Sequence, residues 1–155
     1  MSEILFRGKS IRNNAWVYGG YHKHQLITPC PITPNGENPQ EIKYTSLIIQ
    51  SGFSDWNLPK PLKFYEVAPE TVGQYAGLTD KNGKKIYEGD IIDVWRDGLK
   101  RRFVVKWRES GVPMYILYPQ PLNEDFWHCR SDMDMSWEII GNIYDNPELL
   151  GGDEE

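Results

Sequence analysis

The residue types that most often bind metal are few and irregularly spaced in this chain. His22 and His24 alternate, so on a strand both side chains would lie on one face. The neighbouring His128 and Cys129 would lie on opposite faces. A closed zinc site needs four ligands in a tetrahedral array, so these residues would have to converge with Cys30. Because no Cys-x-x-Cys or His-x-x-x-His spacing occurs, we expect exposed histidines, free thiols and no metal.

Acidic residues offer a second kind of site. In "DKNGKKIYE", Asp80, Asn82 and Glu88 resemble the ligands of a calcium loop. An EF-hand needs its glycine at position 6 and its glutamate at position 12, whereas here, counted from Asp80, they fall at 4 and 9. Pairs such as Glu88 with Asp90, or Asp132 with Asp134, would do acid–base chemistry only if burial raised one pKa. Such pairs are more often solvated turn residues.

Nucleophilic and phosphate-binding motifs are also missing. Cys129 has His128 as its immediate neighbour, which is the wrong geometry for a base on a strand. Neither a Gly-Lys-Ser/Thr phosphate loop nor G-x-G-x-x-G occurs. We therefore predict no catalytic residue, no cofactor, no small-molecule substrate and no enzymatic activity.

The segment "RDGLKRRFVVKWR", residues 96–108, holds six basic residues against one acidic residue. In a hairpin, Arg102 and Lys106 would share a polar face, which Arg96 could join, with Trp95 or Trp107 nearby. Small β-barrels bind single-stranded nucleic acid with such cations and rings. Alternatively, the cations protect an edge strand from aggregation. The possible nucleic-acid contacts are Arg96, Lys100, Arg101, Arg102, Lys106 and Arg108.

Aromatic residues are abundant, with six Trp and nine Tyr. Aromatic side chains commonly anchor interfaces between proteins. Two turn-rich segments, "FSDWNLP" and "DFWHC", carry rings that a partner could reach, or that could instead cap the ends of a barrel. The possible protein-interface residues are Phe53, Trp56, Phe126 and Trp127. Because most soluble oligomers contain identical subunits, self-association is the simplest form of such an interface.

The elements that position these residues are predicted to be short strands. "RRFVVKWR" alternates apolar and polar residues, and turn signals recur at roughly 8–12 residues, which is typical of a small antiparallel barrel or sandwich. Gly83, Gly89 and Gly98 lie where turns are needed, and Gly141 suggests a bulge. "DNPELL" predicts a short helical turn with Asn146 at its N-cap.

The predicted fold is all-β, with an SH3-like small β-barrel. We expect an N-terminal β-extension with long loops over residues 1–68, the barrel over residues 69–150, and a disordered tail over residues 151–155. The barrel strands themselves would run from about residue 87 to residue 146.

Charge and hydropathy restrict the partners. The net charge is −5 and the isoelectric point about 5.2, so the protein as a whole does not attract nucleic acid or anionic membranes. The N-terminal sequence "MSEILFRGKS" shows no apolar signal segment, and no apolar run approaches the length of a membrane span. We therefore expect a protein of a reducing cytoplasm, with reduced cysteines and no membrane partner.

Four blocks together resemble the YopX family, which comprises proteins of bacterial phages and prophages. The blocks are "ILFRGK…AWVYG", "VAPETVGQYAGLTDKNGKKIYEGDII", "VVKW" and "EIIGNIYDNPELL". They extend over residues 4–150, although residues 22–64 and 118–136 contribute nothing to the resemblance. It implies an all-β protein with an SH3-type barrel and a phage or prophage origin. It implies no activity, because the family has no known catalytic residues.

These observations favour a non-catalytic phage or prophage protein that acts by binding. We expect its partners to be copies of itself or a host or phage protein. The alternative is a nucleic-acid-binding accessory protein that uses the basic hairpin 96–108.

Overall fold

The structure, a computed structural model, describes residues 4–26, 43–51, 61–96, 98–109, 113–119 and 136–151. These residues form β-strands and short 3-10 turns, so the all-β prediction is confirmed. Contacts divide the chain into an N-terminal unit, Ile4–Val72, and a C-terminal unit that begins at Gly73, whereas the sequence placed this boundary after residue 68. Among the described residues, there is no helix with the length and apolar character that a membrane crossing requires.

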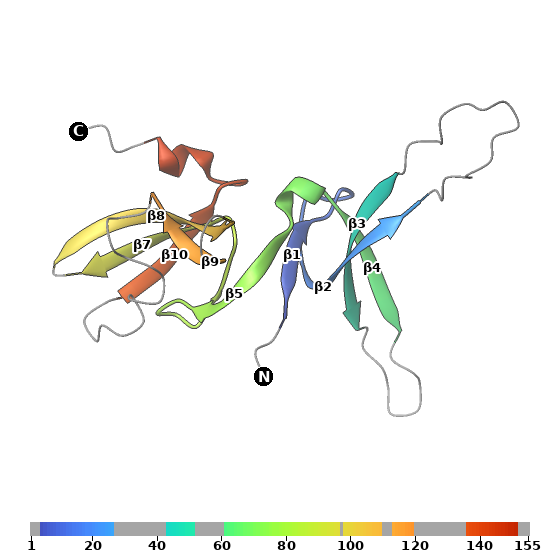
Figure 1. Cartoon of the computed structure of the whole chain (residues 1–155), viewed down its shortest axis with the longest axis horizontal. Helices are drawn as coiled ribbons and strands as arrows, with labels where there is room; N and C mark the ends of the chain where they lie inside the picture. The colour runs from blue at the N-terminus through green and yellow to red at the C-terminus, as the bar shows by residue number, and fades with distance from the viewer. Residues whose placement is uncertain are drawn as a thin grey trace, which may run out of the picture. The chain divides into compact units, whose positions relative to one another are not determined.

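The N-terminal unit is a meander of antiparallel strands (Figure 1). The strands lie in the order β4-β3-β2-β1, and a 3-10 turn, η1, follows β4. Their bounds are Phe6–Lys9 for β1, Trp16–Gln25 for β2, Tyr44–Ser51 for β3, Leu62–Val67 for β4 and Pro69–Thr71 for η1.

The core of this unit lies on one face of the meander, around Ile48 and Val67. Gly8 of β1 lies directly against Val67, because a Cβ added to Gly8 would be 2.9 Å from Val67 Cγ2. A bridge between Ser10 and Val67 then joins the end of β1 to the end of β4. The chain therefore returns to its starting strand before it leaves the unit.

The C-terminal unit combines a hairpin with a second antiparallel sheet. The hairpin is β5–β6, and the sheet has the order β10-β7-β8-β9 (Figure 1). A 3-10 turn, η2, follows β10. The bounds are Gly73–Thr79 for β5, Lys85–Tyr87 for β6, Asp90–Arg96 for β7, Leu99–Arg108 for β8, Met114–Tyr118 for β9, Ser136–Asn142 for β10 and Pro147–Leu150 for η2.

One face of the second sheet, here called the core face, packs against the hairpin. Its buried side chains include Ile92, Val94, Phe103, Val105 and Leu117, and they form one cluster with Ile86 of β6. The opposite face, here called the outer face, is also partly covered, since Ile91, Asp93, Val104 and Ile116 are buried. Both faces of β8 therefore carry buried residues at its centre, and only its ends are exposed.

Glycines shape the turns as predicted. Gly83, Gly89 and Gly98 have φ of 80°, 85° and 76°, which side chains with a Cβ rarely adopt. Gly89 is the most constrained of the three, because its N–H donates to the Val105 carbonyl at 2.8 Å and its carbonyl accepts from the Ile143 N–H at 2.9 Å. The predicted bulge at Gly141 is confirmed by a shift in the β10–β7 register between Ile139 and Gly141.

Three details of the prediction require correction or lack confirmation. The SH3-like barrel is not confirmed, because the strands described here form open antiparallel sheets without closing into a barrel. The basic strand β8 is not an edge strand, since it pairs with β7 on one side and β9 on the other. The turn η2 does form after Asn146, but the Asn146 side chain makes no capping hydrogen bond.

Candidate ligand-binding pocket on the C-terminal unit

The acidic residues that resembled a calcium loop or a catalytic pair are acceptors for backbone N–H groups. Asp80 is buried, and its Oδ1 accepts from the N–H groups of Asn82 and Lys84, each at 2.9 Å. Its Oδ2 accepts from the Ile139 N–H at 3.2 Å. Asp90 is also buried, and its Oδ2 accepts from the Tyr87 N–H at 2.8 Å. Both carboxylates thus fix turns of the hairpin and the sheet.

Glu88 lies in a different environment, near Tyr115 and the backbone of Trp107. Burial raises the pKa of Glu88, although hydrogen bonds from the backbone of Trp107 and Gln74 oppose this shift. Burial, together with the nearby Glu88 charge, raises the pKa of Tyr115 to about 12. The rings of Trp107 and Tyr115 meet edge to face, with centroids 4.8 Å apart. The cluster joins the start of β5 to the end of β8 and the start of β9.

The basic hairpin forms as predicted, but an acidic residue neutralises part of its charge. Asp93 of β7 lies opposite Arg102 of β8 on the outer face. Arg102 Nε donates to Asp93 Oδ1 at 2.9 Å and Nη2 donates to Oδ2 at 3.4 Å. Lys100 Nζ lies 3.5 Å from the same carboxylate. Since the Asp93 side chain is only 5% exposed, this carboxylate depends on the two cations for its compensation.

The other predicted nucleic-acid contacts are divided between the two faces. Arg101 pairs with Val94, so it belongs to the core-face side, where its position at the end of the hairpin leaves it exposed. Lys106 and Arg108 share the outer face with Arg102. Arg108 Nη2 contacts Met114 Sδ at 3.1 Å. For Arg96, the structure describes only the backbone at the end of β7.

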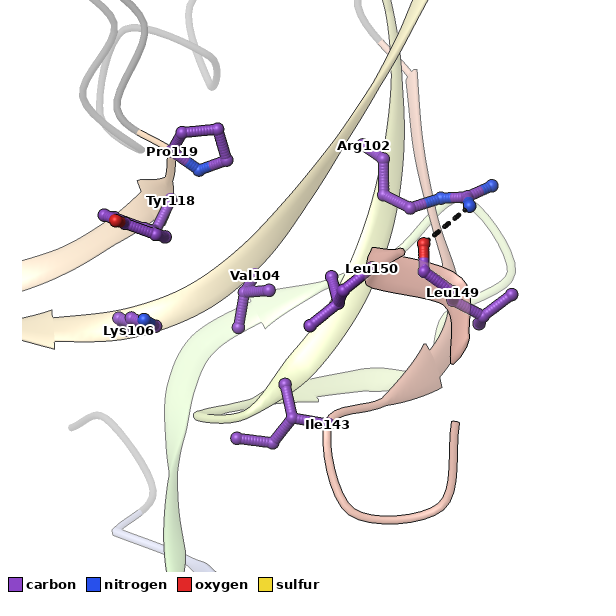
Figure 2. Close-up of a pocket in the computed structure, with 8 residues that line it drawn as sticks. All are labelled: Arg102, Val104, Lys106, Tyr118, Pro119, Ile143, Leu149 and Leu150. Carbon is purple, nitrogen blue, oxygen red and sulfur yellow. Dashed lines mark hydrogen bonds between the residues drawn. The ribbon is translucent and has the colours of Figure 1, made fainter. Parts of the chain in front are cut away.

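Arg102 and Lys106 line an apolar pocket on the outer face (Figure 2). The pocket has a volume of about 470 Å³. Arg102 Nη1 donates to the Leu149 carbonyl at 2.9 Å, and this bond holds η2 beside β8. The lining residues are Arg102, Val104, Lys106, Tyr118, Pro119, Ile143, Leu149 and Leu150.

The surface of this pocket combines apolar contact area with one accessible cation. Tyr118 is 51% exposed and Leu150 is 49% exposed, so two large apolar side chains border it in solvent. Lys106 Nζ lies 4.0 Å from the centroid of the Tyr118 ring. Figure 2 shows Ile143 and Leu150 extending from the C-terminal segment toward Val104. The arrangement suits an apolar group with a neighbouring negative charge.

The structure describes only some of the candidate metal-binding, catalytic and interface residues that were identified in the sequence. The His22 and His24 rings are neighbours, with centroids 5.9 Å apart and planes tilted by 42°. The described residues contain no group of three or more His, Cys, Asp or Glu side chains able to hold a metal. Cys30, His128 and Cys129 lie outside the described residues, as do Asp132 and Asp134. The predicted interface residues Phe53, Trp56, Phe126 and Trp127 also lie outside them.

Sequence reasoning missed the apolar side of the pocket. Besides Val104 of β8, its residues come from β9, from the turn after β10 and from η2, and the last two are distant from the basic hairpin along the chain. One signal was available, because Leu149 and Leu150 are adjacent leucines in a terminal turn. A turn this short cannot bury two leucines by itself, so they indicate a tertiary contact.

Comparison with known proteins places the chain in a family. The family model described as "YopX protein" matches residues 5–151, so the chain belongs to the YopX family. The crystal structure of protein EF1440 from Enterococcus faecalis is similar, with a TM-score of 0.52, 19% sequence identity, and coverage of 97% of this chain and 99% of that chain. This likeness concerns the fold alone. A comparison with curated proteins finds no match.

Proposed function

We propose that this protein is a non-catalytic binding module, in which a pocket on a small SH3-like unit receives a side chain from a protein partner. The observation that supports the proposal is the pocket between β8, β9 and η2, with its apolar lining and bordering cation. A protein of this kind would act in a phage or prophage process by binding its protein partner.

The pocket is large enough to matter energetically. Full burial of a Leu, Ile or Phe side chain contributes roughly 1.5–3 kcal/mol. One such side chain in the pocket would qualify as a binding hot spot, since a few central residues dominate most interfaces. The exposed surfaces of Tyr118 and Leu150 would add contact area at its border.

Two other binding modes have specific features in their favour. Self-association is supported by strand β4, where Leu62 is 58% exposed and Phe64 is 60% exposed on one face of the N-terminal unit. Nucleic-acid binding is supported by Lys100, Arg101 and Lys106, which are exposed on the basic hairpin. The hairpin cations are partly paired with Asp93, however, so we rank this mode below protein binding.

Site-specific photo-crosslinking in bacterial cells tests the proposal. A benzophenone amino acid replaces Tyr118 at the pocket or, as a matched control, Leu99, which is exposed at the hairpin end of β8. We expect a polypeptide that is captured from position 118 and not from position 99. The adduct should disappear when Leu150→Glu places a charge at the pocket border. Equal capture from both positions, or capture that Leu150→Glu does not change, would contradict a pocket-based function.

A further inference from the structure

The two cations of the pocket, Arg102 and Lys106, differ in the groups that they already contact. Arg102 has its guanidinium fixed by the Asp93 carboxylate and the Leu149 carbonyl. Lys106 contacts the Tyr118 ring, and among the described residues no carboxylate forms an ion pair with it. Its ammonium group is therefore the charge that remains available to a ligand. The pocket consequently favours a ligand that carries a negative group close to its apolar group.

The contact between Lys106 and Tyr118 also favours a peptide over a nucleic acid as the ligand of the pocket. Nucleic-acid bases bind to small barrels by stacking on open aromatic faces. Here the ammonium group lies over the Tyr118 ring, which leaves that face covered. The remaining walls are aliphatic side chains, a proline and Arg102, whose guanidinium is already bound to Asp93 and the Leu149 carbonyl. The aliphatic side chains and the proline do not offer an aromatic stacking surface. A peptide needs only an apolar hole and a nearby cation, and this site provides both.

We propose that the ligand of this pocket is a short acidic peptide segment of the protein partner. An aliphatic side chain of the segment enters between Val104, Ile143 and Leu150, and a neighbouring carboxylate pairs with Lys106. This inference rests on the proposed function and adds the chemistry of the partner. The Tyr118 ring holds the ammonium group at the border of the pocket, so little side-chain freedom is lost when the carboxylate binds.

The carboxylate should improve affinity by a modest factor. Exposed ion pairs are weak, and a gain of about two- to fivefold in affinity is expected from one such pair. The aliphatic side chain should account for most of the affinity. Removal of the charge should therefore weaken binding without abolishing it, whereas removal of the aliphatic group should abolish detectable binding.

NMR titration of the full chain, labelled with ¹⁵N, measures these contributions separately. The probes are the capped peptides Ser-Leu-Glu-Leu-Ser, Ser-Leu-Gln-Leu-Ser and Ser-Ala-Glu-Ala-Ser. Shifts of the amides of Val104, Lys106 and Leu150 report binding at the pocket. We expect the glutamate peptide to bind about two- to fivefold more tightly than the glutamine peptide, and the alanine peptide to give no saturable shift.

Variants of the protein identify the cation. Lys106→Gln should remove the preference for glutamate while it preserves binding of the glutamine peptide. The matched control Arg101→Gln changes an exposed cation of the same strand on the core-face side, and should preserve the preference. A short oligothymidylate should leave the pocket amides unmoved.

Each contrary result overturns the acidic-peptide assignment. These results are equal affinity for the two leucine peptides, an unchanged preference in Lys106→Gln, no saturable shift with the glutamate peptide, or a Lys106-dependent response to oligothymidylate. The crosslinking experiment distinguishes this failure from a failure of the proposed function. If the NMR result is contrary but a pocket-specific adduct forms at position 118, the proposed function stands and only the acidic-peptide assignment fails. If the adduct is also absent, both proposals fail.

Discussion

The guanidinium of Arg102 joins the Asp93 carboxylate on the neighbouring strand to the Leu149 carbonyl in η2, with both contacts at 2.9 Å. One side chain therefore compensates a buried charge and positions one wall of the pocket. This relationship explains why part of a basic run serves the fold instead of a ligand.

Replacement of Arg102 by Met should destabilise the C-terminal unit, because Asp93 stays buried with only Lys100 beside it. We expect a loss of about 2–4 kcal/mol in the free energy of unfolding, measured by urea denaturation. Asp93→Asn added to Arg102→Met should recover part of this loss. Arg101→Gln, the matched surface change, should stay within about 0.5 kcal/mol. Equal stabilities for the Met and Gln variants would refute the structural role of Arg102.

Replacement of Gly89 by Val should impair folding without any effect specific to binding. The φ of 85° disfavours a Cβ, and a Cβ built there would lie 3.1 Å from Tyr144 Cε2. Strain alone costs about 1–2 kcal/mol, and the contact adds to it. Gly83→Ala has a similar φ of 80° with nothing within 4 Å, so it should cost only the strain. A melting temperature for Gly89→Val at or above that of Gly83→Ala would contradict this assignment.

Replacement of Gly8 by Ala should overpack the N-terminal unit, because its new Cβ would lie 2.9 Å from Val67 Cγ2. We expect a loss of about 1–3 kcal/mol in unfolding free energy. Gly20→Ala on β2 is the control, since its nearest neighbour, the Ile49 carbonyl oxygen, is 4.0 Å away. The double variant Gly8→Ala with Val67→Ala should lose less than the sum of the single changes. Strict additivity would show that the two positions do not touch.

The raised pKa of Glu88 should make stability depend on pH. In the folded protein this carboxyl holds its proton above its ordinary value of 4.5, so between that value and the raised pKa the folded state binds more protons than the unfolded state. Stability contributed by the neutral form is therefore present at low pH and is lost as the pH rises through this window. Glu88→Gln should remove this loss, so the difference in unfolding free energy between wild type and variant should shift against wild type from pH 4.5 upward. A constant difference would mean that Glu88 titrates normally.

Local features were predictable from the sequence, whereas the pocket was not. Gly83, Gly89 and Gly98 indicate their turns because these turns need a positive φ, which glycine adopts without strain. The strand segments were likewise visible in their alternation. Which strands become neighbours, and whether a sheet closes, depends on contacts that sequence spacing does not encode.

Two tertiary contacts that define the site could not be predicted from the sequence. The first is that Asp93 pairs with Arg102, which converts a run of apparent ligand-binding cations into a partly neutralised surface. The second is that Leu149 and Leu150 return to lie beside β8 and β9. Alternation did place Arg102 and Lys106 on one face of the hairpin, and the structure places both there.

The N-terminal unit closes on itself where it begins and where it finishes. The Lys9 N–H donates to Thr71 Oγ1 at 2.9 Å, and the Ala68 N–H donates to the Lys9 carbonyl at 2.9 Å. A polypeptide module clasped at its two ends can be lengthened in its connecting loops while the exit point of the chain stays fixed. We therefore expect insertions between the strands of this unit to leave its two ends joined.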